Sequence, residues 1–547
     1  MKKTILTFVL VLSLSASTFA QTAAKLNLTA RQAAEQITAA QLKDYLTFVA
    51  SDEMEGRDTP SRGLDITAKF IAALLSRWNV KPAGDNQSYF QKIDLVRTKI
   101  DAAQTQAELN GQPLTYGTDF YAVVRNGSVS NAPLVFGGNG WLVKSKNIDA
   151  LQNADVSGKI VVIYGDGLPR GMTFRDLIAS GKEGTDWADP VSYAQQKGAV
   201  GLIFVSSPNG QSNWQRAVMQ RERGSLRVSK TSEDKQTITI PSIFISRSVA
   251  EKTFQGEAAD LNKITSDAES NIPLAAFNFS AGKNFSFKIA TKTETMATQN
   301  VVGMIEGSDA VLKAEMVALG AHYDHVGMNP NAPGADKIWN GADDDGSGTV
   351  AILSIAEALA KSAQKPKRSV LFVWHAGEEK GLWGSDYFTR FPTVSLKNVI
   401  TQLNIDMIGR SKKASDTNPK NAELSGPNQV YVIGSKMMSS ELGNISAAVN
   451  NSYLKLTYDY RYDDPKDPNR FFFRSDHYNY AKNGVPIIFY FDGVHEDYHQ
   501  PGDEVSKIDF DKMQKIARTV FLTMWTVADL KTRPVVDKQL PAELTQR

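Results

Sequence analysis

The sequence predicts an α/β protein with a mostly parallel central sheet flanked by helices, into which a β-rich domain is inserted. From about residue 286 onward, apolar runs alternate with helical segments, and this βαβ rhythm is typical of a parallel sheet covered on both faces. From about residue 100 to 285, short β-rich runs are separated by Gly, Ser and Asn. At 547 residues the chain is also too long for one core.

The elements follow from their apolar patterns. Residues 28–80 are predicted to be helical, with Thr29 as an N-cap, because apolar residues recur there at helical spacing. In the β-rich stretch we expect strands such as 159–164, 201–205 and 238–245. After residue 286 we expect helices at 348–360 (amphipathic), 439–450 and 510–530, and strands at 316–321, 369–374, 399–405 and 485–491.

Residues 1–20 are typical of a cleaved secretory signal: Lys2 and Lys3, an apolar run, and small residues before Gln21. The alternative, a membrane anchor, is disfavoured because the apolar run is short for a span. Removing these residues leaves 59 basic and 59 acidic side chains. Such a balance offers no basic field for nucleic acid or an anionic membrane. We therefore expect an exported protein, periplasmic or extracellular, with no nucleic-acid partner and no membrane span; its oligomeric state is left open.

All six histidines lie between His322 and His499, most of them beside carboxylates. Imidazole and carboxylate together suit Zn²⁺, and the absence of cysteine excludes thiolate ligands. Candidate ligands follow three predicted strands: His322 the first, Glu378 and Glu379 the next, and Asp406 the third. Because open α/β sheets bind ligands beyond the carboxyl ends of their strands, these residues are expected to converge on one site.

Two runs of adjacent acids strengthen this interpretation. Asp343, Asp344 and Asp345 precede a predicted helix, and Glu378 and Glu379 follow a predicted buried strand. Neighbouring carboxylates disfavour joint ionisation unless a cation is close. For the aspartates the alternative is that they cap the N-terminus of the following helix. The two roles are compatible, since one aspartate can bind a metal while a neighbour caps the helix. For the glutamates the alternative is a solvated loop.

Five segments carry a family resemblance: G-A-H-Y-D-H-V-G, N-G-A-D-D-D-G-S-G, A-G-E-E-K-G-L-W-G-S, N-I-D-M-I-G and D-Y-H-Q-P-G-D. On these segments the chain resembles the co-catalytic two-zinc exopeptidases related to aminopeptidase Y and glutamate carboxypeptidase II. The 100–285 stretch resembles the protease-associated (PA) domain that many members carry as an insertion. The resemblance implies the zinc exopeptidase fold, with an N-terminal helical part of the peptidase domain at 21–99, the PA insertion at 100–285, the catalytic domain at 286–533 and a tail at 534–547.

The resemblance also implies two Zn²⁺ per chain. The first would be bound by His322, Asp344 and Asp406, and the second by Asp344, Glu379 and His499. Asp344 would bridge the two ions, and a cis peptide bond would follow it. Three protein ligands per metal leave a position open for water, as in catalytic zinc sites.

The remaining roles concern the reaction. Glu378 would take the proton from the zinc-activated water and pass it to the leaving amine. Tyr498 would stabilise the developing oxyanion, although a purely structural tyrosine is the alternative. Asp324 would accept the second imidazole N–H of His322, and Asp503 would steady His499.

The other histidines are not predicted to bind metal. His325 and His477 lie near the site in sequence but match no ligand position. His375 follows a core strand and is expected to make a buried hydrogen bond, whereas His495 is expected on a loop surface.

The pattern therefore predicts an exported zinc aminopeptidase that acts on peptides. The main alternative is a glutamate-releasing carboxypeptidase, which needs a basic cluster for which Arg410 and Arg474 are candidates. Glutaminyl cyclisation on the related one-zinc scaffold is disfavoured because every two-zinc position is filled. A non-catalytic, receptor-like homologue is disfavoured because no ligand is lost.

Overall fold

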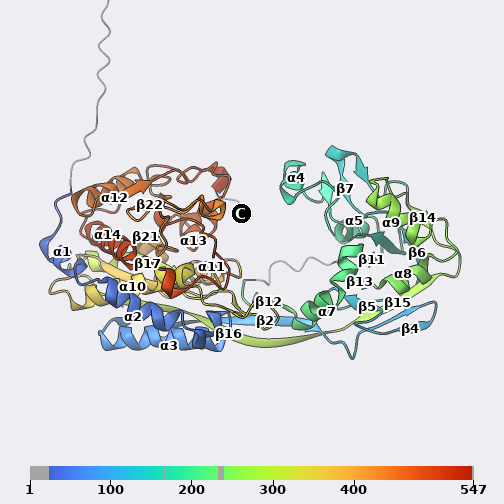
Figure 1. Ribbon diagram of the computed structural model, residues 1–547, viewed down its shortest axis with the longest axis horizontal. Helices are drawn as coiled ribbons and strands as arrows, with labels where there is room; N and C mark the ends of the chain where they lie inside the picture. The colour runs from blue at the N-terminus through green and yellow to red at the C-terminus, as the bar shows by residue number, and fades with distance from the viewer. Residues whose placement is uncertain (1–23, 166, 232–238, 545–547) are drawn as a thin grey trace, which may run out of the picture. The chain divides into compact units, whose positions relative to one another are not determined.

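The computed structural model describes residues 24–165, 167–231 and 239–544. The predicted signal at residues 1–20 lies outside them and stays a prediction. The chain forms two compact units, one containing the residues up to Ile93 and from Ala297 onward, the other Asp94–Met296. Two long strands, β2 (Phe90–Ile100) and β16 (Thr291–Ile305), run through both boundaries (Figure 1). The boundaries between the units therefore lie inside these two strands. The predicted boundaries near residues 100 and 285 follow a change in composition, and composition does not mark a position within a strand.

The sheet of the first unit is parallel in its centre and antiparallel at its flanks. Four neighbouring strands run parallel, and they are β20 (Ser369–His375), β17 (Met316–His322), β21 (Val399–Ile405) and β24 (Ile487–Phe491). β16 pairs antiparallel with β20 on one side, and β22 (Gln429–Ile433) pairs antiparallel with β24 on the other. Beyond β22 lies the short parallel strand β23 (Thr457–Asp459). The predicted α/β class is confirmed, and the parallel centre supplies strand ends on one edge.

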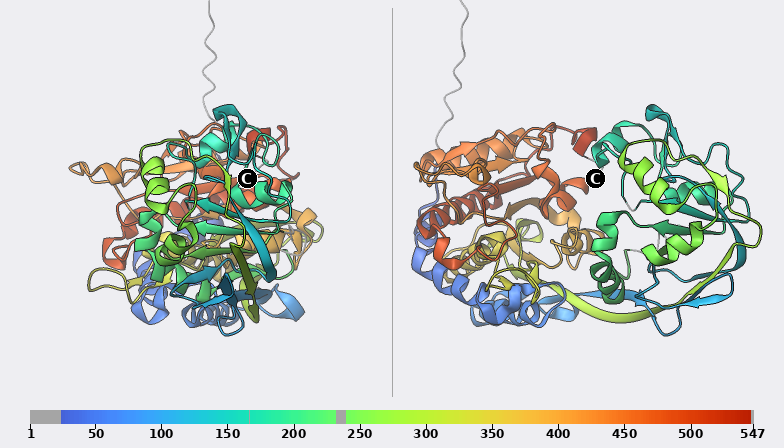
Figure 2. Two further views of the ribbon diagram at one scale, coloured as in Figure 1. Left: turned by 90° about the vertical axis from the view of Figure 1, so that its right-hand side faces the viewer. Right: turned by 45° about the vertical axis from the view of Figure 1, so that its right-hand side comes forward.

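Helices cover both faces of this sheet. One face packs against α1 (Leu28–Ala34), α2 (Ala39–Val49), α3 (Arg62–Arg77), α10 (Gly348–Lys361), α12 (Ser440–Ser452) and α14 (Phe510–Ala528). The other face packs against α11 (Trp383–Arg390) and α13 (His477–Lys482). Figures 1 and 2 show the blue N-terminal helices in the same unit as the orange and red C-terminal segments. The N-terminal helices therefore complete the core of this unit.

Two local predictions about helices were wrong. The first helix is capped by Asn27, whose Oδ1 accepts from the backbone N–H groups of Thr29 (2.9 Å) and Ala30 (3.2 Å). An Asn side chain satisfies N–H groups that a helix start leaves without partners. α10 is not amphipathic, since every residue from Gly348 to Leu359 is buried. It lies between the sheet and helices α2 and α14, and a helix surrounded in this way has no solvated face.

The second unit is built on a separate β-sheet. Its strand order is β4-β3-β15-β6-β9-β11-β13-β5. The central strands β6 (Gly127–Phe136), β9 (Ile160–Tyr164), β11 (Gly201–Val205) and β13 (Ser242–Ile245) are parallel neighbours. The outer strands are β4 (Gln112–Leu114), β3 (Gln106–Leu109) and β15 (Asn284–Ile289) on one side and β5 (Phe120–Ala122) on the other. The helices α5 (Pro190–Gln196), α7 (Trp214–Arg223), α8 (Arg247–Phe254) and α9 (Leu261–Glu269) belong to the same unit. A β-rich domain is therefore inserted in the chain, as the sequence predicts.

The described residues after 533 pack against the first unit. Leu544 is buried in the apolar cluster on the second face of the first unit's sheet. The backbone N–H of Val535 donates to Glu441, and that of Lys538 donates to the carbonyl of Met438. This segment is part of the first unit. Among the described helices, none combines the length and hydrophobicity that a membrane span requires.

Candidate metal centre

The ends of three parallel strands deliver the predicted ligands to one edge of the sheet. His322 is the last residue of β17, Asp406 directly follows β21, and Glu378 follows β20. The His322 Nε2 atom lies 3.7 Å from Asp406 Oδ2 and 4.0 Å from Glu378 Oε2. Residues more than eighty positions apart therefore meet because their strands are neighbours in register.

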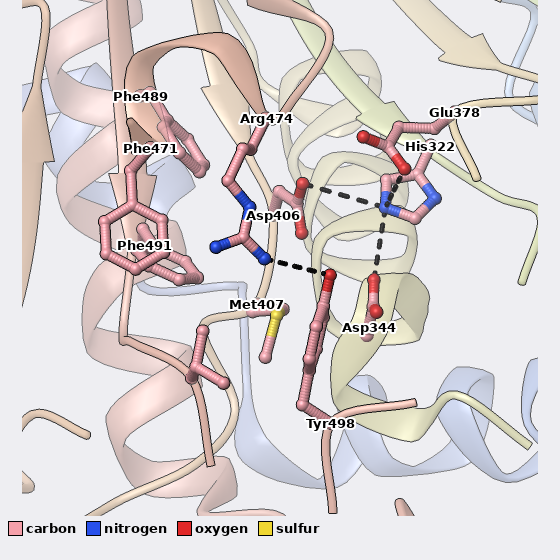
Figure 3. Close-up of a pocket in the computed structure, with 11 residues that line it drawn as sticks. His322, Asp344, Glu378, Asp406, Met407, Phe471, Arg474, Phe489, Phe491 and Tyr498 are labelled. Atoms are coloured by element: carbon pink, nitrogen blue, oxygen red, sulfur yellow. Dashed lines mark hydrogen bonds and ion pairs between the residues drawn. The ribbon is translucent and has the colours of Figure 1, made fainter. Parts of the chain in front are cut away.

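Asp344 stands between two groups of potential ligands. Its Oδ1 lies 3.3 Å from His322 Nε2, and its Oδ2 lies 3.1 Å from His499 Nε2. Glu379 Oε2 is 3.0 Å from the same His499 nitrogen. Figure 3 shows Asp344 and Asp406 both directed at the same nitrogen of the His322 ring. The structure thus brings together both predicted sets, His322 with Asp344 and Asp406, and Asp344 with Glu379 and His499.

His325 joins the second group, although no ligand role was predicted for it. Its Nδ1 lies 3.0 Å from Glu379 Oε1 and 3.8 Å from Asp344 Oδ2. Its ring meets that of His499 edge to face, with centroids 5.6 Å apart. The only sequence signal was its place in H-Y-D-H, three positions after His322.

The buried carboxylates and unpartnered polar atoms of this cluster indicate a cation-binding site. Burial raises the pKa of Glu378 well above its usual value, and Glu379 and Asp406 add to that effect. Burial alone would lower the pKa of His499, but its contacts with Asp344 and Glu379 raise it to about 10. Several buried atoms also lack a hydrogen-bond partner, and they are Asp344 Oδ2, Glu379 Oε1, His499 Nε2 and both ring nitrogens of His325. Buried polar atoms normally have partners, and a bound cation would supply the missing partner here. Imidazole nitrogens and carboxylate oxygens are ligands that suit Zn²⁺.

The loop that carries Asp344 is fixed by its acidic neighbours. Asp345 Oδ1 accepts from the N–H of Gly348 at 2.8 Å, which is the capping role expected for a neighbour of Asp344. The peptide bond between Asp344 and Asp345 is cis. Asp503 accepts from the N–H groups of Asp343 and Asp344 at 3.0–3.1 Å. Asp503 therefore holds this loop, and the expectation that it also steadies His499 stays a prediction.

A buried layer of charges supports the loop from behind. Asp343 Oδ1 accepts from the N–H of Gly409 at 2.6 Å, and its Oδ2 lies 3.3 Å from His495 Nε2. His495 is therefore buried, contrary to the surface position predicted for it. Arg410 lies in the same layer, where its guanidinium donates to Asp497 at 3.0 Å and lies 3.3 Å from His495 Nδ1.

Asp324 is positioned by groups on both sides of it. Its carboxylate accepts from the Thr59 hydroxyl at 2.9 Å and from the N–H of Glu378 at 3.2 Å. His322 Nδ1 lies 3.1 Å from the backbone carbonyl of Asp324 but 3.6 Å from its carboxylate. The imidazole is therefore oriented mainly by the carbonyl, while the Asp324 carboxylate ties Glu378 to the same loop.

The two remaining histidines take no part in either ligand group. His375 Nε2 lies 3.0 Å from the Tyr480 hydroxyl, the buried hydrogen bond that was predicted. His477 stacks on Phe489 in the core, and burial lowers its pKa to about 3.

Arg57 connects the N-terminal segment to this centre. Its guanidinium is fully buried and donates to four backbone carbonyls at 2.7–2.9 Å, those of Val49, Tyr323, Asn340 and Gly341. Tyr323 adjoins His322, and Gly341 begins the turn that leads to Asp344. Arg57 therefore braces both ligand loops.

Replacing Arg57 with lysine is expected to destabilise the protein by about 3 kcal/mol or more. Lysine keeps the charge but cannot place donors on four carbonyls, and breaking a buried charged network costs roughly 3–5 kcal/mol. Chemical denaturation measures the free energy of unfolding. The control is Arg62→Lys at an exposed position, which should change it by less than about 0.5 kcal/mol. An unchanged midpoint for Arg57→Lys would contradict the bracing role.

A pocket with one apolar wall opens beside the ligands. It is lined by His322, Asp344, Glu378 and Asp406 on one side and by Met407, Phe471, Phe489, Phe491 and Val494 on the other. Arg474 and Tyr498 complete the lining, and Figure 3 shows them between the two sides. A group bound at the metals could therefore place an apolar side chain among the phenylalanines.

Tyr498 is held by Arg474. The guanidinium donates to the Tyr498 hydroxyl at 3.2 Å and lies 5.7 Å from the centre of its ring. Burial raises the pKa of Tyr498, and the nearby Asp344 carboxylate adds to that effect. Because Arg474 supplies a hydrogen to the phenol oxygen, the phenol's own hydrogen remains available for another acceptor.

The fold and this paired cluster define a candidate two-metal centre in an α/β protein, and two parts of the chain match known families. Residues 300–524 match Peptidase family M28, and residues 129–253 match the PA domain. Residues 300–524 are therefore similar to M28 peptidase domains and residues 129–253 to PA domains, and the predicted resemblance is confirmed.

Curated relatives match over part of their length. A probable zinc metalloprotease of Phaeosphaeria nodorum is 26% identical over 279 residues, which cover 43% of this chain and 53% of that protein. Leucine aminopeptidase 2 of Trichophyton rubrum is 25% identical over 308 residues, with coverage of 49% and 56%. This chain thus spans about half the length of these relatives.

Among solved structures, the aminopeptidase from Aneurinibacillus sp. strain AM-1 is similar, with a TM-score of 0.51 and 16% identity. The similarity covers 93% of this chain and 98% of that one. At this identity the likeness shows a shared fold.

Proposed function

We propose that the protein is a zinc-dependent aminopeptidase that hydrolyses the N-terminal peptide bond of peptides, with two Zn²⁺ per chain. The observation that carries the proposal is the position of Asp344, whose two carboxylate oxygens face separate ligand groups. The names of the relatives, zinc metalloprotease and leucine aminopeptidase, support the same class. A pair of bound zinc ions supplies Lewis acidity, which polarises a carbonyl and makes a water acidic at neutral pH.

Glu378 is the residue suited to proton transfer. It lines the pocket and lies 4.0 Å from His322 Nε2, yet it belongs to neither ligand group. Its backbone N–H is bound to Asp324, which fixes where the side chain begins. A carboxylate held beside the reacting atoms can accept a proton and return it to the leaving amine.

Tyr498 is suited to bind the oxygen of the scissile carbonyl. Its hydroxyl accepts from Arg474 and lines the same pocket as Glu378. A preorganised O–H donor favours the charge that develops on that oxygen during attack.

Beside the metals, the pocket offers little positive charge for a second carboxylate of a C-terminal glutamate. Asp344, Glu378 and Asp406 contribute carboxylates to the lining, whereas Arg474 is its single guanidinium among the described residues. Arg410, the other candidate for binding a carboxylate, is buried against Asp497 and does not line the pocket. A glutamate-releasing carboxypeptidase would lack the basic cluster that it needs.

The proposal is tested by zinc content and by cleavage of aminoacyl-nitroanilides and C-terminal glutamyl peptides. We expect close to two zincs per chain and chelator-sensitive release from Leu, Met and Phe substrates, with Glu and Asp substrates slower by at least about tenfold. The apolar wall favours the first group, since one buried apolar side chain contributes roughly 1.5–3 kcal/mol. Cleavage of the glutamyl peptides alone would move the protein to the carboxypeptidases. A metal-free, inactive chain would contradict both activities.

A further inference from the structure

We propose that His325 is a fourth protein ligand of the second zinc ion, so that the two metal sites are unequal and the second holds its ion more tightly. This inference rests on the proposed two-zinc function. It concerns a histidine that matches no ligand position in the family resemblance.

The distances around His325 are those between ligands of one ion. Its Nδ1 is 3.0 Å from Glu379 Oε1 and 3.8 Å from Asp344 Oδ2. Metal bonds of about 2.0–2.2 Å in a tetrahedron separate neighbouring ligand atoms by roughly 3.3–3.6 Å. One atom from each of His325, Asp344, Glu379 and His499 lies within 4.8 Å of all the others.

The contact between His325 and Glu379 is close, but its geometry is poor for a hydrogen bond. Both ring nitrogens of His325 and the Oε1 atom of Glu379 are buried and have no hydrogen-bond partner. A buried polar atom without a partner costs roughly 1–3 kcal/mol. The two atoms lie 3.0 Å apart in poor hydrogen-bond geometry, and this placement fits two lone pairs directed at one cation.

The His325 ring is also fixed in place by its surroundings. The backbone N–H of His325 donates to the carbonyl of Arg57 at 3.1 Å. Gly341 packs against the ring so closely that a Cβ there would lie 2.5 Å from His325 Cγ. The His325 ring is therefore closely packed beside the cluster, which limits its movement as a ligand.

The additional imidazole makes the two donor sets different. The first group has one nitrogen, from His322, beside the carboxylates of Asp344 and Asp406. The second has two nitrogens, from His325 and His499, beside the carboxylates of Asp344 and Glu379. Imidazole nitrogen suits Zn²⁺ and Co²⁺, whereas oxygen-rich sites suit Mn²⁺ and Mg²⁺. We therefore expect the second site to fill first when the metal-free chain is titrated.

The first test is zinc titration of the metal-free full chain against a chromophoric chelator. Wild type should take up two zincs in two steps. In His325→Ala the tighter step should weaken at least about 100-fold, because even outer-shell partners of a ligand contribute 10–100-fold to affinity. The control is His375→Asn, which replaces an equally buried histidine outside both groups and should leave both steps unchanged. Unchanged steps in His325→Ala would overturn the inference.

The second test is a direct spectroscopic one on His325→Cys. The chain has no cysteine, so a thiolate-to-Co²⁺ charge-transfer band in the near ultraviolet can only come from the introduced sulfur. We expect this band at one Co²⁺ per chain, and none in Co²⁺-loaded wild type. A folded variant that binds Co²⁺ without the band would overturn the inference. Wild type without any bound metal would overturn the proposed function as well, whereas two zincs with an unaffected His325→Ala would overturn the inference alone.

Discussion

Replacing Glu378 with glutamine is expected to lower kcat by about 10²–10⁴-fold while both zinc ions stay bound. Glutamine keeps the shape of the side chain but cannot take up a proton, and positioned acid–base groups contribute about 10²–10⁴-fold to rates. The metals should remain because Glu378 belongs to neither ligand group. Steady-state kinetics with Leu-nitroanilide and zinc analysis of the same sample measure both quantities.

The neighbouring glutamate provides a matched control. The same change at Glu379 removes a carboxylate of the second ligand group, so Glu379→Gln should lose one zinc as well as activity. Two identical substitutions at adjacent positions thus separate proton transfer from metal binding. Retained activity in Glu378→Gln would remove Glu378 from the reaction, and loss of zinc from that variant would make it a ligand instead.

The sequence was informative wherever strand order decides position. His322 and Asp406 each close an apolar run, and a parallel sheet aligns the ends of such runs at one edge. The same rule applies to Glu378 after β20. The pattern of apolar residues therefore predicted both the parallel centre of the sheet and the place where ligands meet.

Loop conformation explains what the sequence did not predict. His325 lies beyond the end of β17, where no periodicity says which way a side chain points. Asp503 acts on the backbone N–H groups of Asp343 and Asp344, and backbone groups leave no signal in a sequence because every residue except proline carries them. Arg57 escapes prediction for the same reason, since its four partners are carbonyls.

Burial of charge was also hidden in the sequence. His495 was expected at the surface and Arg410 was a candidate for binding a substrate carboxylate, but each lies against an aspartate in the layer behind the metal loop. A chain with a dense acidic cluster needs such partners inside, and which polar residues serve depends on the fold. The buried α10 shows the converse, since its composition did not distinguish a helix covered on all sides from one with a solvated face.

Replacing Asp344 with asparagine is expected to weaken both zinc sites at once, each by at least about 100-fold, and to lower kcat/KM by about 10³-fold or more. An outer-shell partner alone contributes 10–100-fold to metal affinity, and Lewis-acid stabilisation of several kcal/mol is lost with the metals. Zinc titration of the metal-free variant measures the affinities.

The bridging role is decided by comparing Asp344→Asn with variants of residues that belong to one ligand group only. Asp406→Asn should weaken the first site and Glu379→Gln the second, and the two changes combined should reproduce the zinc content of Asp344→Asn. Asp344 has this double effect because its Oδ1 faces His322 and its Oδ2 faces His499. Full occupancy of both sites in Asp344→Asn, or loss from only one, would show that this carboxylate does not connect them.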